Sequence, residues 1–387
     1  KLVPFGVIDK GQVYPIATDY GNWWRIVFAD RVGYVRKSEV HIESEVTFKK
    51  YNISLQEAVN IQMKANPQTD KKQYAYVSKA YIDENNRVTA DALNVRTGPG
   101  TNYKSIGTLP KGTKVTILEE VNGWYAIQYN NSEWVHAISE DVYYFLNPDN
   151  FKNDPIRKFQ FLDLTKPSGA TSSQLNKYLS GKGTLHNQGQ AFIDAALVHR
   201  VNEVYLIAHA ILETGHGTSL LASGEIQVGE ISNERYVVVI PKGNKKGTYI
   251  VENYNSSKNR KVTKNDNYNL RNVNLKNIYN MFGIGAFDFD SNPEVYGAVK
   301  AYQEKWYSPR EAIIGGAQFI GRNYLDQGQN TLYKMRWNPQ AMVELGYATH
   351  QYATDIGWAY KQSRTIHDLY KEIGIDVYFF EIPEYKK

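Results

Sequence analysis

Glu213 is the residue whose surroundings most strongly suggest chemistry. It closes an apolar run that begins at Val204, and Gly215 and Gly217 follow it at once. Apolar neighbours and the negative end of a helix dipole both disfavour the charged form of a carboxyl group. A general acid needs a carboxyl group that still carries its proton near neutral pH. The sequence therefore makes Glu213 a candidate general acid, and an ordinary helix-end residue is the alternative.

Two other kinds of chemistry fit the same stretch less well. His209 and His216 flank the carboxylate, but a zinc-binding helix needs two histidines four residues apart with a glutamate beside the first. No third ligand is obvious, and no Gly-x-Ser-x-Gly elbow of a serine hydrolase occurs. We therefore expect no metal and no organic cofactor. His216 is expected to hydrogen-bond the loop that follows the carboxylate.

The elements that must position this carboxylate are mostly helices. The run before it has the spacing of a buried helix, and its apolar members are Leu206, Ile207, Ala210, Ile211 and Leu212. Glycines at the end of the run stop such a helix. Further helices are predicted at 54–63, 172–179, 189–200, 309–319 and 356–369. Residues 225–265 alternate β formers with glycine turns and predict an inserted β-lobe, and 376–383 predict a terminal strand.

Three sequence blocks together resemble one known family. They are Glu213-Thr-Gly-His-Gly-Thr-Ser219, Tyr279-Asn-Met-Phe-Gly-Ile-Gly-Ala-Phe287 and Tyr352-Ala-Thr-Asp-Ile-Gly-Trp358. In this order they resemble the bacterial N-acetylglucosaminidase autolysins, glycoside hydrolase family 73. The resemblance covers about residues 159–366. It implies a mainly α, lysozyme-like domain with a β-lobe, which cleaves peptidoglycan on the reducing side of N-acetylglucosamine.

Glycoside hydrolysis also needs a group that stabilises or traps the oxocarbenium ion. The β-lobe offers Glu230 and Glu252 first, because apolar residues flank them, and then Glu225 and Glu234. The separation of the two carboxyl groups would decide the outcome: roughly 5 Å suggests retention, and roughly 6.5–9.5 Å suggests inversion.

The third block offers a different second group. The resemblance implies that Tyr352 lies in the active site, and Asp355 follows it in the same block. A 2-acetamido group on the substrate can also attack the anomeric carbon itself, as in substrate-assisted hydrolases. The two side chains would then orient or polarise that group. The sequence leaves these mechanisms open.

Several residues near the three blocks are predicted to bind substrate. Glycines let a backbone approach a glycan chain closely, and an aromatic ring can stack on a sugar or pack in the core. The predicted substrate-binding residues are Tyr279, Phe282, Gly283, His216 and Trp358. For Phe282 and Trp358, core packing is the alternative.

The composition limits the class of protein. The chain has 387 residues, no cysteine and a formal net charge of +5. It therefore has no cysteine nucleophile, disulfide or Cys-ligated zinc, and its charge alone is too small to indicate nucleic acid. No apolar run is long enough to span a bilayer. The chain begins without a basic-then-apolar signal segment, so we interpret it as a mature protein or a fragment.

A second resemblance covers the N-terminal part. Leu93-Asn-Val-Arg-Thr-Gly-Pro-Gly100 resembles bacterial SH3 domains, small β-barrels used for wall attachment. Similar glycine and aromatic patterns at 21–28 and 123–129 form an internal repeat, which predicts a divergent or truncated first copy. The predicted domains are an SH3-like module at 1–46, a helical connector at 47–86, an SH3-like module at 87–147 and the glucosaminidase domain at 148–387.

The resemblances together imply a secreted, wall-associated autolysin of a Gram-positive bacterium, expected to be a monomer. Its partners would be peptidoglycan glycan strands, and stem peptides if the SH3-like modules bind them. A muramidase or a lytic transglycosylase on the same fold, or an inactive wall-binding protein, are the alternatives.

Overall fold

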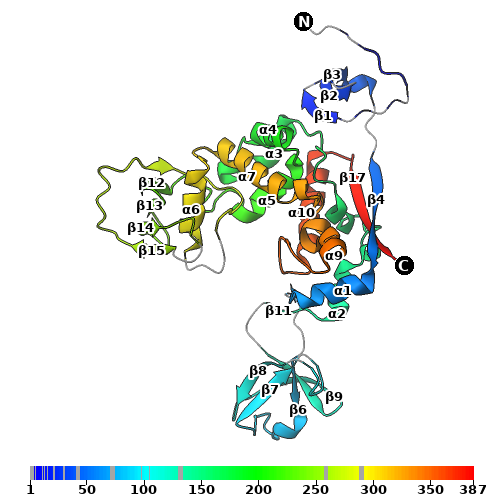
Figure 1. The fold of residues 1–387 in the computed structure, drawn as a ribbon, viewed down its shortest axis with the longest axis vertical. Coiled ribbons are helices and arrows are strands. Elements are labelled where there is room, and N and C mark those ends of the chain that lie inside the picture. Colours follow the sequence, from blue (N-terminus) through cyan, green and yellow to red (C-terminus); the bar gives the residue numbers. More distant parts are fainter. Residues whose placement is uncertain are drawn as a thin grey trace. The chain divides into compact units, whose positions relative to one another are not determined.

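A computed structural model gives the fold of most of the chain (Figure 1). It describes residues 4, 6–10, 12, 14, 16–20, 22–28, 31–40, 44–69, 75–96, 98–103, 105–129, 134–256, 260–286 and 292–387. These residues form two compact units, which are described separately. The first unit contains Lys1–Asn52, Pro148–Gln340 and Ala359–Lys386, and the second contains Ile53–Asn147 and Ala341–Trp358.

Helices build the centre of the first unit. They are α3 (Ser172–Leu179), α4 (Gly189–His199), α5 (Glu203–Thr214), α6 (Pro293–Gln303), α7 (Pro309–Asn323), α8 (Leu332–Trp337) and α10 (Trp358–Ile373). Helix α9 (Pro339–Leu345) begins in this unit, and most of its residues belong to the second unit. Side chains close several of their N-termini, because the first N–H groups of a helix otherwise have no partner. Thr171 and Gln174 form a capping box on α3, and Asn202 caps α5. The predicted helices at 172–179, 189–200 and 309–319 are confirmed by these bounds.

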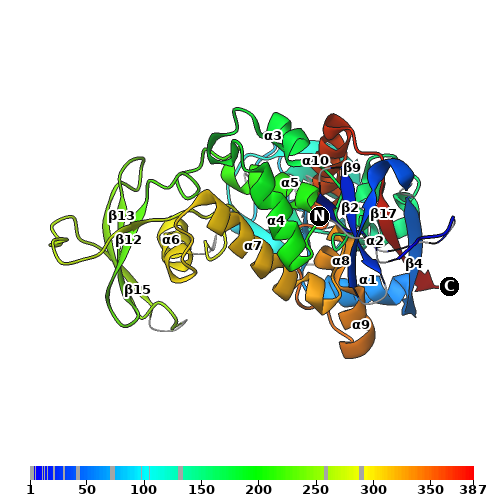
Figure 2. The same cartoon turned by 90° about the horizontal axis from the view of Figure 1, so that it is seen from above.

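A β-sheet projects from the helices between α5 and α6. It is antiparallel and has the order β15-β14-β13-β12-β16. The strands are β12 (Gln227–Ser232), β13 (Arg235–Ile240), β14 (Gly247–Glu252), β15 (Lys261–Lys264) and β16 (Lys276–Asn277). Helix α6 lies against this sheet in both views (Figure 2). The sheet is longer than the predicted 225–265 segment, because β16 returns to pair with β12.

The first unit also contains strands from both ends of the sequence. β4 (Glu45–Ser54) forms a two-stranded sheet with β17 (Phe379–Lys386). Side chains of helix α8 also contact β17: Lys334 pairs with Glu381, and the Tyr333 and Tyr385 hydroxyls lie 2.8 Å apart. The predicted start of a helical connector at 47 is wrong, since Val46-Thr-Phe-Lys-Lys-Tyr51 is part of a strand.

The second unit contains an SH3-like sheet with the order β8-β7-β6-β10-β9. Its strands are β6 (Ala75–Ser78), β7 (Ala92–Arg96), β8 (Ser105–Pro110), β9 (Thr116–Val121) and β10 (Trp124–Gln128). The buried core comprises Ala75, Val77, Val88, Leu93, Val95, Val115 and Ile127. Because β6 pairs with both β7 and β10, this sheet begins before the predicted boundary at 87.

Helix α1 (Leu55–Lys64) and helix α2 (Ser139–Leu146) also belong to the second unit. Ser54 and Glu57 form the capping box that was predicted for α1. Strand β5 (Gln68–Thr69) follows α1 and pairs with β11 (Val135–His136).

The N-terminal residues form a smaller sheet. β1 (Ile16–Tyr20), β2 (Trp23–Phe28) and β3 (Arg31–Arg36) are antiparallel and pair in sequence order. Three described strands are fewer than the five of the SH3-like sheet, so a first SH3-like module stays a prediction.

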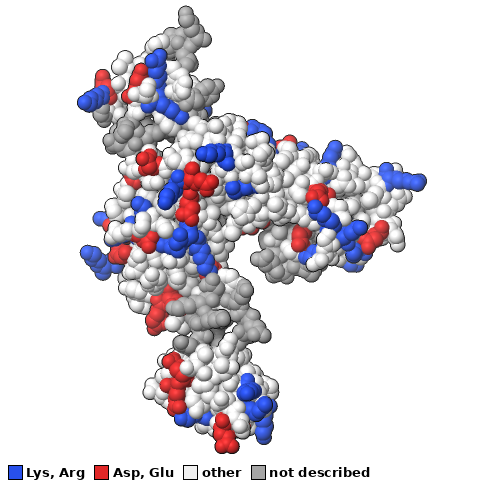
Figure 3. All heavy atoms as spheres, turned by 180° about the vertical axis from the view of Figure 1, so that it is seen from behind, with Lys and Arg blue, Asp and Glu red and all other residues white. Residues whose placement is uncertain are grey.

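Charged side chains of both signs are interspersed over the face drawn in Figure 3. This distribution agrees with the modest net charge of +5. Among the described residues, no helix combines the length and the apolar character that crossing a membrane requires.

Candidate active site

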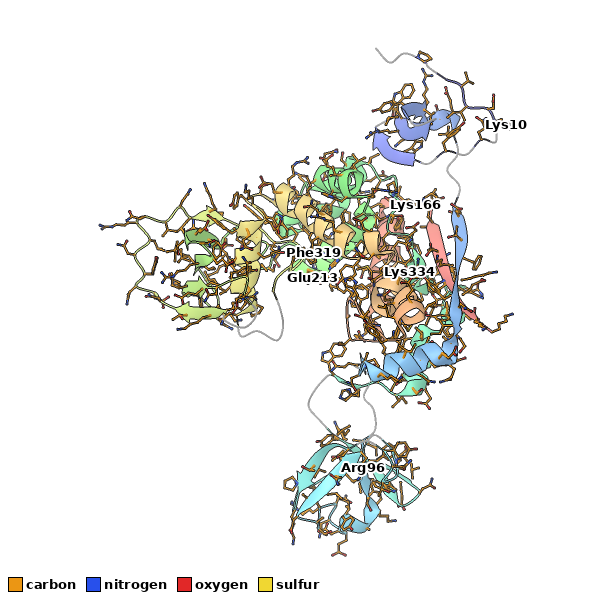
Figure 4. All side chains as sticks on the ribbon, viewed as in Figure 1. Lys10, Arg96, Lys166, Glu213, Phe319 and Lys334 are labelled. Carbon is orange, nitrogen blue, oxygen red and sulfur yellow. The ribbon has the colours of Figure 1, made fainter. Side chains whose placement is uncertain are left out.

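Glu213 lies in the last turn of helix α5 (Figure 4). Gly215 caps the helix in the left-handed conformation, with φ at 53°. The helix is buried up to Ile211, as predicted, but Leu212 is 54% exposed. Leu212 was predicted to be buried, and it is not, because it lies on the other side of the helix from the core. The carboxylate itself is partly open, with its side chain 34% exposed.

A row of three polar side chains follows one face of α5. Tyr205, His209 and Glu213 are four residues apart, which places them above one another on a helix. The Tyr205 hydroxyl lies 3.0 Å from His209 Nδ1, and His209 Nε2 lies 3.4 Å from Glu213 Oε1. Tyr205 is 2% and His209 is 6% exposed. The row therefore runs from the core of the protein to the carboxylate.

The proton on the His209 ring follows from its contact with Tyr205. Burial raises the pKa of Tyr205 far above its ordinary value, and its hydroxyl can donate to His209 Nδ1 or to Met335 Sδ, which lies 3.9 Å away. Where the hydroxyl donates to Nδ1, the proton of a neutral imidazole lies on Nε2 and faces Glu213. Sequence reasoning had considered His209 only as a metal ligand, although the spacing of four residues could have revealed this contact.

The second block is shaped by a buried asparagine that the sequence analysis missed. Asn280 is 1% exposed. Its Nδ2 donates to the carbonyl oxygens of Ile284, at 2.8 Å, and Gly297, at 3.2 Å. Its Oδ1 accepts from the N–H groups of Phe282 and Ile284. One side chain thus fixes the turn that carries Phe282 and Gly283.

The structure brings this turn to Glu213. Phe282 is 4% exposed and meets the His209 ring edge to face, with centroids 5.6 Å apart. The packing therefore supports a core role for Phe282 over stacking on a sugar, because a buried ring has no face open to a sugar. A Cβ added to Gly283 would lie 3.2 Å from Glu213 Oε2. Phe287, at the end of the block, lies outside the described residues.

Gly283 is expected to be sensitive to a single added methyl group. Its φ is 62°, and a Cβ would press on the carboxylate. Gly283→Ala should lower kcat/KM about tenfold, because small displacements of a catalytic group are costly, and destabilise the fold by about 1–2 kcal/mol. Gly328→Ala is the control, because φ is 80° there and a Cβ would meet no described atom within 4 Å. Equal activity in both variants would contradict the expectation.

The turn after Glu213 consists of three left-handed residues. Gly215, His216 and Gly217 have φ values of 53°, 63° and 76°. The His216 N–H donates to the Ile211 carbonyl at 2.9 Å, and the Gly217 N–H donates to Thr214 Oγ1 at 2.7 Å. His216 is exposed and serves the turn through its backbone. This conformation explains why the block places glycines on both sides of one histidine.

Gly217 allows two turns to touch. Its carbonyl accepts from the Thr184 N–H at 3.1 Å, and a Cβ on Gly217 would lie 2.4 Å from the Lys182 carbonyl oxygen. Gly217→Ala should therefore destabilise the fold by about 2–4 kcal/mol, since it combines a left-handed residue with a steric clash. Urea unfolding measures this loss. Gly181→Ala, with φ at 72° and no described atom within 4 Å of a Cβ, should lose only the conformational part, and an equal loss in both would contradict the clash.

The third block lies in the second unit. The Tyr352 ring stacks on Trp358, with centroids 4.6 Å apart and an interplanar angle of 27°. Asp355 is 7% exposed, and its Oδ1 accepts from the Gly357 N–H at 2.9 Å. The buried carboxylate therefore closes the turn before α10, which favours a structural role over the catalytic role predicted for it.

The carboxylates of the β-lobe have different surroundings. Glu252 pairs with Arg235 at 3.3 Å, Glu225 pairs with Lys242 at 2.6 Å, and Glu234 accepts from Asn255 at 3.1 Å. Glu230 lies exposed on β12. Glu252 already has an ion-pair partner within the lobe, so the structure favours it less than the sequence did.

The described residues contain no group of three or more His, Asp or Glu side chains that could hold a metal ion. Tyr279 is half-buried, and its ring packs so closely on Gly224 that a Cβ there would lie 2.3 Å from it. The site thus consists of one partly open carboxylate, a buried histidine behind it and a tightly packed glycine turn beside it. This arrangement can hold and transfer one proton.

Models of two protein families match the chain. Residues 91–141 match "Bacterial SH3 domain", and residues 189–371 match "Mannosyl-glycoprotein endo-beta-N-acetylglucosaminidase". The second match includes Glu213 and all three blocks. The chain therefore carries a domain of a glycoside hydrolase family together with an SH3 domain of the bacterial type. Residues 189–371 form a domain of the glucosaminidase family, as the three blocks predicted.

Similar proteins agree with this assignment. A β-N-acetylglucosaminidase of Bacillus subtilis (strain 168) is 41% identical over 342 residues, which are 87% of this chain and 32% of that protein. A bifunctional autolysin of Staphylococcus aureus (strain MSSA476) is 40% identical over 260 residues, 67% of this chain and 17% of that protein. The crystal structure of S. aureus glucosaminidase B has a TM-score of 0.51 at 26% identity, covering 90% of this chain and 96% of that one. The chain thus spans a third or less of the curated relatives' length.

Proposed function

We propose that this protein is an endo-β-N-acetylglucosaminidase that hydrolyses the β-1,4 bond on the reducing side of N-acetylglucosamine in peptidoglycan. The observation that carries the proposal is the position of Glu213. It ends a buried helix, contacts a buried histidine and remains 34% exposed on its outer side. A general acid needs both a defined position and access to the leaving oxygen.

In this mechanism Glu213 protonates the glycosidic oxygen as the bond to the anomeric carbon breaks. A second group stabilises or traps the oxocarbenium ion. We infer that Glu230 is the preferred carboxylate of the lobe, because it is exposed while Glu252 is paired with Arg235. The substrate's own 2-acetamido group, oriented by Tyr352, is the alternative.

The proposed location of the protein is the cell wall. The relatives named as autolysins and the SH3 domain at residues 91–141 support this location. The SH3 domain would raise the effective concentration of the enzyme at its polymer. Glycan strands are the proposed substrate, and the enzyme would act in wall turnover or cell separation.

Mass spectrometry of digested peptidoglycan tests the proposal. Reducing the products with borohydride marks each new reducing end. Reduced N-acetylglucosamine is the expected end. Reduced muramic acid would identify a muramidase, and anhydro-muramic acid would identify a lytic transglycosylase. Sedimentation with the wall without any new ends would make this a wall-binding protein.

A further inference from the structure

The loop that carries Tyr352 is held by a segment almost three hundred residues earlier in the sequence. Strand β5 follows helix α1 and lies beside residues 354–356. The Gln68 N–H donates to the Thr354 carbonyl at 2.9 Å, and the Ile356 N–H donates to the Gln68 carbonyl at 2.8 Å. These two bonds fix the backbone of the loop immediately after Tyr352.

A side chain of α1 holds the loop on the other side of Tyr352. Gln62 is fully buried, at 0% exposure. Its Oε1 accepts from Gln351 Nε2 at 2.9 Å, and its Nε2 lies 3.2 Å from Met342 Sδ. Gln351 is the residue directly before Tyr352. The buried amide therefore contacts both helix α9 and the residue directly before the tyrosine.

Burying an amide side chain in a core is unfavourable compared with burying an apolar one. Removing an amide from water costs free energy unless it finds hydrogen-bonding partners. The neighbouring inner positions of α1, Ala58 and Val59, are both apolar and at 0% exposure. Packing alone would be served by an apolar residue at position 62. A glutamine at this position is explained by its hydrogen bond to Gln351, which orients the loop.

We propose that Gln62 is a positioning residue that fixes the loop of Tyr352, so that the segment from α1 to β5 is a structural part of the catalytic apparatus. This inference rests on the alternative within the proposed function in which Tyr352 orients the substrate's 2-acetamido group. The sequence predicted a helical connector at residues 47–86. β5 also pairs with β11, the strand that follows the SH3-like sheet in the sequence.

Replacing Gln62 with leucine tests the proposal in the full chain. Gln62→Leu keeps the volume of the side chain and removes the amide. It should lower kcat on peptidoglycan about tenfold and leave KM within about twofold, because misorienting a catalytic group affects turnover more than binding. Gln56→Leu on the same helix, where the glutamine is exposed and bonds Asn60, is the control and should be unchanged.

A second variant shows whether the loop is the route of the effect. Gln351→Leu removes the other partner of the same hydrogen bond. If that bond carries the effect, the double variant Gln62→Leu/Gln351→Leu should be as active as each single variant. The effects of two substitutions that remove the same contact do not add. Additive losses would overturn the proposal, as would Gln62→Leu retaining full kcat while Tyr352→Phe loses it.

Amide hydrogen exchange separates this proposal from the proposed function. In Gln62→Leu the Ile356 amide should exchange about tenfold faster, while the amides of α5 keep their rates. This result would support the positioning role even if the wild-type protein produced no new reducing ends. Unchanged exchange at Ile356 would overturn it, whatever the activity.

Discussion

Replacing Glu213 with glutamine is expected to lower the rate of peptidoglycan hydrolysis by at least about 10²-fold, because an amide cannot donate the proton that the leaving oxygen needs. The fold should be preserved, since glutamine has the same shape and keeps an oxygen near His209 Nε2. The rate of formation of new reducing ends measures the loss. Circular dichroism and the urea midpoint check the fold.

The kind of substrate can show whether Glu213 acts as an acid. A dinitrophenolate leaving group needs little protonation, so Glu213→Gln should lose much less activity on a glycoside that carries it. Glu304→Gln is the matched control, because Glu304 also ends a helix, is 42% exposed and pairs with Lys300. Residual peptidoglycan turnover within about tenfold of wild type would remove Glu213 from the role of acid.

Replacing His209 with phenylalanine should have the second largest effect. Phenylalanine keeps the ring that packs against Phe282 but removes the nitrogen that faces Glu213. The carboxyl group then loses its inner contact and becomes less well oriented. We expect kcat to fall about 10–100-fold, because small errors in the position of a catalytic group are costly. Steady-state kinetics on purified peptidoglycan measure the change.

Two further variants identify what His209 contributes. Glutamine can place an N–H near the position of Nε2, so His209→Gln should recover part of the activity. Tyr205→Phe removes the hydroxyl that lies 3.0 Å from Nδ1 and should have a smaller effect, because the contact with Glu213 stays. If His209→Phe were as active as wild type, His209 would be a core residue and nothing more.

Local patterns predicted the central parts of the fold and site. The apolar run before Glu213 predicted helix α5, and Ser54 with Glu57 predicted the start of α1. The glycines after Glu213 predicted a break, and the structure gives it three left-handed residues. Such features depend on neighbours in the sequence, so a single sequence contains the information for them.

The remaining parts depend on contacts between distant residues. Asn280 looks like an ordinary turn residue, and only its burial against Gly297 reveals its role. Asp355 was predicted to be catalytic because it stands beside Tyr352, but its carboxylate is turned to the Gly357 N–H. The domain boundary at 47 failed for the same reason, because strand β4 finds its partner more than three hundred residues later.

The pairing of β4 with β17 has a practical consequence for anyone who dissects this protein. A recombinant fragment cut at residue 148, where the glucosaminidase domain was predicted to begin, would lack β4 and leave an edge of β17 unpaired. An open edge strand is a template for association between molecules. Such a fragment would be prone to aggregate, and its low activity would then reflect a missing strand. A fragment that retains residues 45–54 avoids this defect. The boundaries of the shortest soluble enzyme therefore have to include both paired strands, whatever the order of domains in the sequence.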